Sequence, residues 1–240
     1  MSDHLSRKEL KQDKIKETLE HSAEAVFSHG QMVLAVLVVI LVVAVGYAGW
    51  TIYHDRKTNE ASSALDDAMK AYNGRIGPSN DPLAPGELSY SDESARAQDA
   101  LQKFEAVVQK YPSTEPGRRA KYYEALCLED LQRFAQALEA LKQVSSSGDK
   151  ELASMAQYQT ALIYARTGKP DDAVKILRSL ADTGAVFTPR PLVLLELATV
   201  LRHSHPQEAA GVYQQIKKEF PNTSISGEAD RGLETISPQS

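Results

Sequence analysis

The strongest constraint on this chain is an apolar run of 21 residues, Met32–Ile52, which contains no charged side chain. As a helix it rises about 31 Å, close to the ~30 Å thickness of the hydrocarbon core of a bilayer. A helix satisfies its own backbone hydrogen bonds, which lipid cannot do. Trp50 and Tyr53 lie at one end, where aromatic side chains favour the headgroup region. Buried core helices are usually shorter and have a polar face, so the run predicts a membrane-spanning helix rather than a core helix.

The segment before this run, residues 1–31, alternates charges and carries five Lys or Arg against six Asp or Glu. Leu10, Ile15 and Leu19 recur at near-helical spacing, so we expect a solvated or interfacial amphipathic helix. A cleavable signal peptide fits poorly, because the leader is long and not net positive and the apolar run exceeds a usual signal. A Gly-Tyr-Ala string inside the run keeps peptidase cleavage open as the alternative.

Basic residues on the two sides of the run argue for opposite orientations in the membrane. Five precede it, but the nearest, Lys16, is 16 residues from Met32, whereas Arg56 and Lys57 follow directly. If only the Lys and Arg residues close to the membrane are counted, the positive-inside rule places the C-terminal side in the cytoplasm. If those of the whole N-terminal tail are counted, the rule places the tail in the cytoplasm. Charge alone leaves the orientation open.

The rest of the composition excludes several functions. The net charge is -5, without the clustered basic face that nucleic acid requires. The single cysteine, Cys127, cannot form an intramolecular disulfide, and its apolar helical context predicts a small buried side chain. No phosphate-binding, dinucleotide-binding or nucleophile-elbow motif occurs, and His203-Ser204-His205 lacks partners at metal-ligand spacing. We therefore expect no enzyme activity, no cofactor, no metal and no small-molecule substrate.

Helix-breaking residues divide the region that follows the apolar run. Residues 58–72 carry Ala, Leu, Met and Tyr at helical spacing, whereas residues 73–92 contain six Pro or Gly and are expected to be a loop. An amphipathic helix then runs from Ser94 to Pro112, and its end resembles Tyr213–Pro221. The two helices are therefore predicted to form a first hairpin with a long loop.

Beyond that hairpin, apolar residues recur every 36 residues. A turn signal separates two helical segments in every unit: Gln132-Arg133, Gly168-Lys169-Pro170 and Ser204-His205-Pro206. The recurring sets are Ala125, Ala161 and Leu197; Leu128, Tyr164 and Val200; Ala137, Ala173 and Ala209; Leu141, Leu177 and Tyr213; and Val144, Leu180 and Ile216. This pattern predicts three helical hairpins stacked in a solenoid.

The second unit, ALIYARTGKPDDAVKIL, resembles the tetratricopeptide repeat. Tyr164, Gly168, Ala173 and Leu177 stand where that pattern has Tyr, Gly, a small residue and an apolar residue. The unit is slightly longer than usual, and the first and third copies lack the Gly. The resemblance implies an all-α chain with one N-terminal transmembrane helix followed by a right-handed tetratricopeptide-like helical-hairpin solenoid.

The whole architecture resembles the YfgM-like family, which comprises ancillary subunits of the SecYEG translocon. The resemblance implies a bacterial inner-membrane protein with a cytoplasmic N-terminus and a periplasmic repeat domain. Its partners are then SecYEG, periplasmic chaperones or unfolded secreted chains, and its role is to assist protein secretion and hand-over to those chaperones. Two alternatives remain: an envelope scaffold for cell-wall or cell-division machinery, and a cytoplasm-facing membrane-tethered scaffold.

In such a solenoid the first helix of each hairpin lines the concave surface. The family's groove positions fall on Arg119, Tyr122, Leu126, Asp130, Met155, Tyr158, Leu162, Arg166, Leu194, Ala198 and Arg202. Relatives that clamp a peptide carboxylate use Lys and Asn at the central positions, where this chain has Tyr and Leu. An apolar strip rimmed by Arg suits an amphipathic or extended segment of another protein. The alternative is that these side chains pack internally.

We therefore expect five segments along the chain. They are a cytoplasmic charged tail over 1–31, a transmembrane helix over 32–53, a first hairpin over 54–112 with its loop at 73–92, three repeats over 113–221, and a capping helix with a tail over 222–240. A solenoid needs a polar-faced terminal element. Ser226–Ile236 fits this role, with Ser226 or a neighbour as N-cap and Glu228 in the first turn.

Overall fold

The computed structural model describes residues 30–77, 85–183 and 187–236. Within these ranges it contains nine helices and one pair of two-residue strands. The chain divides into two compact units, Met1–Arg56 and Lys57–Ser240. The amphipathic helix expected within the charged tail lies outside the described residues.

Helix α2 runs without a break from Gly30 to Tyr72. The helix expected over 58–72 is thus the continuation of the apolar helix rather than a separate element. Side chains in its apolar part, such as Leu41 and Val42, keep more than 60% of their surface exposed among the described residues. A core helix would bury such side chains, so this part of α2 is a candidate membrane span.

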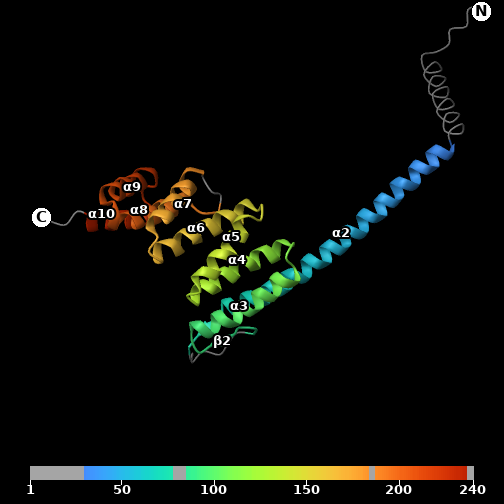
Figure 1. The fold of residues 1–240 in the computed structure, drawn as a ribbon, viewed down its shortest axis with the longest axis horizontal. Helices are drawn as coiled ribbons and strands as arrows, with labels where there is room; N and C mark the ends of the chain where they lie inside the picture. Colours follow the sequence, from blue (N-terminus) through green and yellow to red (C-terminus); the bar gives the residue numbers. More distant parts are fainter. Residues whose placement is uncertain (1–29, 78–84, 184–186, 237–240) are drawn as a thin grey trace, which may run out of the picture. The chain divides into compact units, whose positions relative to one another are not determined.

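The other described helices follow one another as antiparallel hairpins, and each packs against the next along the chain (Figure 1). They are α3 (Glu93–Lys110), α4 (Glu115–Asp130), α5 (Phe134–Ser145), α6 (Lys150–Arg166), α7 (Pro170–Thr183), α8 (Arg190–Ser204), α9 (Pro206–Glu219) and α10 (Ser224–Ile236). The three predicted turns fall between α4 and α5, between α6 and α7, and between α8 and α9. Gly168, at φ 77°, adopts the left-handed backbone that glycine accepts without strain. The predicted all-α fold of helical hairpins is confirmed.

The end of α2 and helix α3 form the first hairpin. The ring centroid of Tyr72 lies 6.2 Å from that of Phe104, and the Tyr111 hydroxyl donates a hydrogen bond of 3.2 Å to Glu60. Ala61 and Ala68 of α2 are completely buried, because small side chains let α2 lie close against its neighbours. The repeat domain therefore begins inside α2.

Burial follows the 36-residue period. Among the recurring residues, Tyr164 and Val200 are half-buried and all the others are buried. Ala137, Ala173 and Ala209 have no exposed surface at all. Each alanine lies on the second helix of its hairpin, where a larger side chain would force the packed helices apart.

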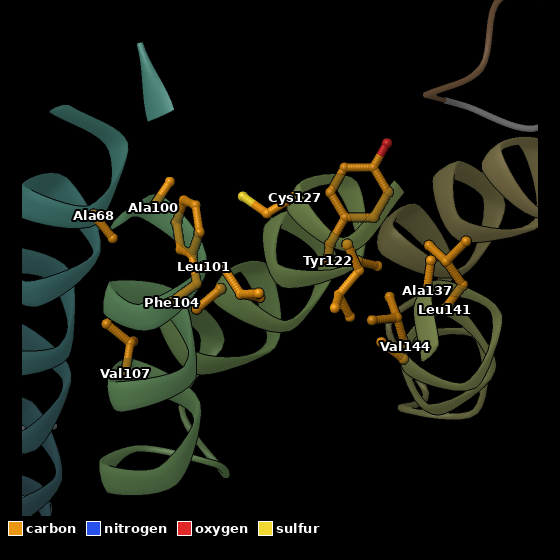
Figure 2. Close-up of a cluster of buried hydrophobic side chains, with 14 of the residues drawn as sticks. Ala68, Ala100, Leu101, Phe104, Val107, Tyr122, Cys127, Ala137, Leu141 and Val144 are labelled. Carbon is orange, nitrogen blue, oxygen red and sulfur yellow. The ribbon is translucent and has the colours of Figure 1, made fainter. Parts of the chain in front are cut away.

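The buried apolar side chains fall into two clusters. The first extends from Ala61 to Ile163, and Figure 2 shows part of it, with Phe104 of α3 and Leu141 of α5. The second extends from Ala161 to Ala229. Among the described residues, α6 is the helix that contributes side chains to both clusters.

Residues 73–92, expected to be a loop without regular structure, contain a short strand pair. Strands β1 (Arg75–Ile76) and β2 (Ser89–Tyr90) pair in parallel, and the Tyr90 hydroxyl donates to Asp99 of α3 at 2.5 Å. A strand of two residues has no alternation of apolar and polar positions, so no sequence pattern reveals it.

Helix α10 packs on α8 and α9 at the end of the solenoid. It begins at Ser224, and Thr223 provides the cap, because its hydroxyl oxygen accepts a 3.2 Å hydrogen bond from the Ser226 N–H. The helix therefore begins earlier than predicted, and Ser226 lies within its first turn instead of at the N-cap. Glu228 lies beyond the first turn, so the predicted acidic first turn is wrong.

Candidate functional site

The first helices of successive hairpins line two pockets in the repeat domain. The one nearer the N-terminus, called the proximal pocket below, has a volume of about 610 Å³. It lies between α2, α4 and the start of α6. Leu65, Met69, Tyr122, Met155 and Phe187 form its apolar surface. Phe187 belongs to the segment before α8 and is half exposed, so it adds an apolar edge to the pocket.

The second pocket, called the distal pocket below, has a volume of about 630 Å³. It lies between the end of α4, the second half of α6, and α8. Leu162, Ala165, Pro170 and Val200 supply its apolar walls. The two pockets therefore follow one another along α4 and α6, the first helices of two consecutive hairpins.

The structure brings five of the eleven predicted groove residues into these pockets. Arg119, Tyr122 and Met155 line the proximal pocket, and Leu162 and Arg166 line the distal pocket. Asp130, another of these predicted residues, is exposed and faces Arg96 of α3 at 3.9 Å.

The remaining predicted positions lie outside the linings of the two pockets. Leu126 and Tyr158 are half-buried against the first and second core clusters, and Arg202 is half-buried on α8. Leu194 and Ala198 belong to the second core cluster and keep at most 3% of their surface exposed. Helix α8 packs against α7, α9 and α10, and these contacts cover the positions of Leu194 and Ala198.

The predicted arginine rim is balanced by carboxylates. Arg119 forms an ion pair with Glu115, and Arg166 forms one with Glu129. The Arg166 guanidinium also lies 5.4 Å from the centroid of the Phe134 ring. Both arginines therefore already have partners within the repeat domain.

Carboxylates outnumber arginines in both pocket linings. The proximal lining contains Asp66, Glu115, Asp149 and Glu151 against the single Arg119. The distal lining contains two glutamates against one arginine and a histidine. The groove that the two pockets form is thus apolar on its walls and acidic in net charge, which the sequence did not predict.

The two glutamates of the distal pocket, Glu129 and Glu196, differ in how their charge is compensated. Glu129 is 8% exposed, and it accepts hydrogen bonds from Gln159 and Arg166. Burial raises the pKa of Glu129, and these two partners oppose the rise. Burial also raises the pKa of Glu196, where no partner opposes it. Glu196 makes no hydrogen bond or ion pair among the described residues.

Sequence reasoning did not single out either glutamate. Glu196 has a visible signal, because it is the one charged residue in the apolar stretch Leu192–Val200. A lone charge in an apolar helix is costly unless something compensates it. Glu129 has no such signal, since its partners Gln159 and Arg166 are 30 and 37 residues away.

The histidines and the cysteine of the repeat domain lie outside the lining of the proximal pocket, and His203 alone among them lines the distal pocket. Within the described ranges, no three His, Cys, Asp or Glu side chains are arranged to hold a metal ion. His203 and His205 are exposed, and His205 shares a 2.9 Å hydrogen bond with Ser204. Burial raises the pKa of the Cys127 thiol to about 12, so it stays protonated at neutral pH.

Comparison with known proteins places the repeats in a family. The family model of the tetratricopeptide repeat-like domain matches residues 27–189, which include the apolar part of α2. The model of the tetratricopeptide repeat matches residues 192–223, which contain α8 and α9. No curated protein matches the chain. Because the first match covers more than half of the chain and the hairpins agree with it, this protein belongs to the tetratricopeptide repeat-like domain family.

Proposed function

We propose that this chain is a membrane-anchored protein-binding module whose groove, formed by the proximal and distal pockets, binds segments of other proteins. The observation that carries the proposal is that two apolar pockets follow one another on the first helices of consecutive hairpins. A row of pockets of this kind accommodates side chains of an extended or helical segment. The apolar part of α2 serves as the anchor, and the module acts by binding rather than by catalysis.

Within that function, we assign the chain to protein secretion. Its partners are the SecYEG translocon, together with periplasmic chaperones or unfolded secreted chains, and its repeat domain lies on the periplasmic side of a bacterial inner membrane. The support is the resemblance of the whole architecture to the YfgM-like family: a short charged tail, one span and a compact run of hairpins. A scaffold for cell-wall or cell-division machinery is the competing assignment.

Site-specific photo-crosslinking in intact cells tests both levels of the proposal. A photoreactive amino acid replaces Met155 in the proximal pocket or Leu162 in the distal pocket of the full chain. Ser179, exposed on α7, a second helix of a hairpin, is the control position. We expect adducts with translocon subunits, chaperones or secreted chains from the two groove positions and not from Ser179.

Other outcomes separate the two levels. Groove-specific adducts with cell-wall or division proteins would retain the binding module and replace the secretion role. The same adducts in equal amounts from the groove and control positions would contradict the proposal that the groove is the binding surface.

A further inference from the structure

The distal pocket combines apolar walls with one carboxylate that has no partner. Leu162 and Ala165 of α6, Val200 of α8 and Pro170 at the start of α7 line the pocket. Glu196, one turn before Val200 on α8, lines the same pocket. Walls of this kind suit the aliphatic part of a long side chain, and the carboxylate suits a positive charge at its end.

Neither Arg166 nor His203 of the pocket forms an ion pair or hydrogen bond with Glu196 among the described residues. Arg166 is held by Glu129 and lies over the Phe134 ring, so its guanidinium is engaged on the α4–α5 side. Burial and the charge of Glu196 raise the pKa of Tyr158, whose neutral side chain has no positive charge to pair with Glu196. An ionised carboxylate that is half-buried without a donor is an unfavourable arrangement for a folded protein. It becomes favourable when a ligand supplies the donor.

On the basis of the binding function proposed above, we propose that the distal pocket selects a protein segment that carries a lysine or arginine side chain among apolar residues. The stem of that side chain packs against Leu162 and Val200, and its charged end pairs with Glu196. The four carboxylates of the proximal pocket favour further basic residues in the same segment. The selection is thus opposite in sign to a clamp that holds a peptide carboxylate.

Binding of matched peptides to the full chain tests this selection. The protein is placed in nanodiscs of zwitterionic phosphatidylcholine, so that peptide charge does not drive binding to lipid. The probes are fluorescein-labelled peptides of roughly a dozen residues, rich in leucine and alanine, with a central lysine, arginine, norleucine or glutamate. Affinity is measured by fluorescence anisotropy at near-neutral pH.

We expect the lysine and arginine peptides to bind about tenfold more tightly than the norleucine peptide, a ratio equal to about 1.4 kcal/mol. Glu196→Gln should abolish this preference, so that the lysine, arginine and norleucine peptides bind the variant with similar affinity. Glu234→Gln, which removes an exposed carboxylate on α10, should leave the preference intact. Leu162→Ala should weaken the binding of every peptide, because it removes part of the apolar wall of the distal pocket.

Several results would overturn the proposal. Equal affinity for the lysine and norleucine peptides, or an unchanged preference in Glu196→Gln, would refute charge selection and leave the groove as a binding site. Tightest binding of the glutamate peptide would assign selection to Arg166 instead. Failure of every peptide to bind would contradict the binding function together with the selection that rests on it.

Discussion

Glu129 and Glu196 show how two chemically identical side chains in one pocket can have different consequences. Glu129 receives hydrogen bonds from an amide and a guanidinium, which replace the water that it loses on folding. Glu196 loses part of its hydration without such replacement, so its ionised form lowers the stability of the fold. A free carboxylate kept at a cost to stability is typical of a functional position.

The sign of this cost leads to a pH-dependent prediction. The folded-state pKa of Glu196 lies above the ordinary value of 4.5. Folding therefore favours the protonated carboxyl group, and the stability that this preference provides is fully present below pH 4.5. That contribution is lost as the pH rises through the raised folded-state value. Glu196→Gln removes the charge, so at neutral pH we expect a slightly higher thermal midpoint than for the unchanged protein. Well below pH 4.5 the two midpoints should coincide.

Circular dichroism of the full chain in detergent, recorded at both pH values, checks this expectation. Glu234→Gln provides the matched control and should show no pH-dependent difference. A lower midpoint for Glu196→Gln at neutral pH would mean that Glu196 has a stabilising partner in the folded chain.

At the scale of single helices, α5 offers a test of the packing register. Ala137 is completely buried, whereas Ala135, two residues earlier on the same helix, is exposed. Ala137→Leu inserts three carbon atoms into a packed hairpin, and overpacking of this kind costs about 1–3 kcal/mol. Ala135→Leu should change stability little, because Leu and Ala have similar helix propensities. Thermal unfolding of the two variants distinguishes them, and equal midpoints would contradict the register.

Helix α10 offers a test in which two like substitutions have opposite signs. A Cβ at Gly232 would lie 2.4 Å from Cζ of Tyr213, a ring that is only 2% exposed and cannot move aside freely. A Cβ at Gly227 would meet nothing within 4 Å. Gly227→Ala should therefore stabilise the chain by about 0.5–1 kcal/mol through helix propensity, and Gly232→Ala should destabilise it. If both variants were stabilised, α10 would not pack on Tyr213 as described.

The sequence predicted the features that depend on a periodic pattern of apolar residues. Ala137, Ala173 and Ala209 were identifiable because a small buried residue recurs at one period and each is followed by apolar residues at helical spacing. The strand pair of β1 and β2 could not be predicted, because a strand of two residues shows no periodicity. The ion pair between Arg166 and Glu129 could not be predicted either, because no sequence pattern indicates that two charges 37 residues apart are neighbours. The groove was therefore predicted as arginine-rimmed, although its net charge is acidic.

At the scale of the whole molecule, the secretion role proposed above requires that the repeat domain lie outside the cytoplasm. Long domains cross membranes largely regardless of charge, so Arg56 and Lys57 do not prevent export of the repeat domain. Ser147 is exposed between α5 and α6, and Cys127 is the only native thiol. Ser147→Cys in a Cys127→Ala background therefore places one reactive thiol on the repeat domain.

For a periplasmic repeat domain, we expect a thiol reagent that does not cross the inner membrane to label this variant in intact spheroplasts. The Cys127→Ala chain without the new cysteine is the control for background. Labelling that requires lysis would place the repeats in the cytoplasm and remove the secretion role, leaving a cytoplasm-facing membrane-tethered scaffold.

From the two core clusters we expect the repeat domain to open as two cooperative blocks that share helix α6. In a linear array each block can open locally while the other stays folded. The lining of the distal pocket includes Glu129 from a helix of the first block and Glu196 from a helix of the second. A ligand bound there therefore contacts both blocks and stabilises them together. Amide hydrogen exchange in α9 and α10 should then slow when a ligand binds, although neither helix lines the pocket. Unchanged exchange there would mean that the two blocks already open as one.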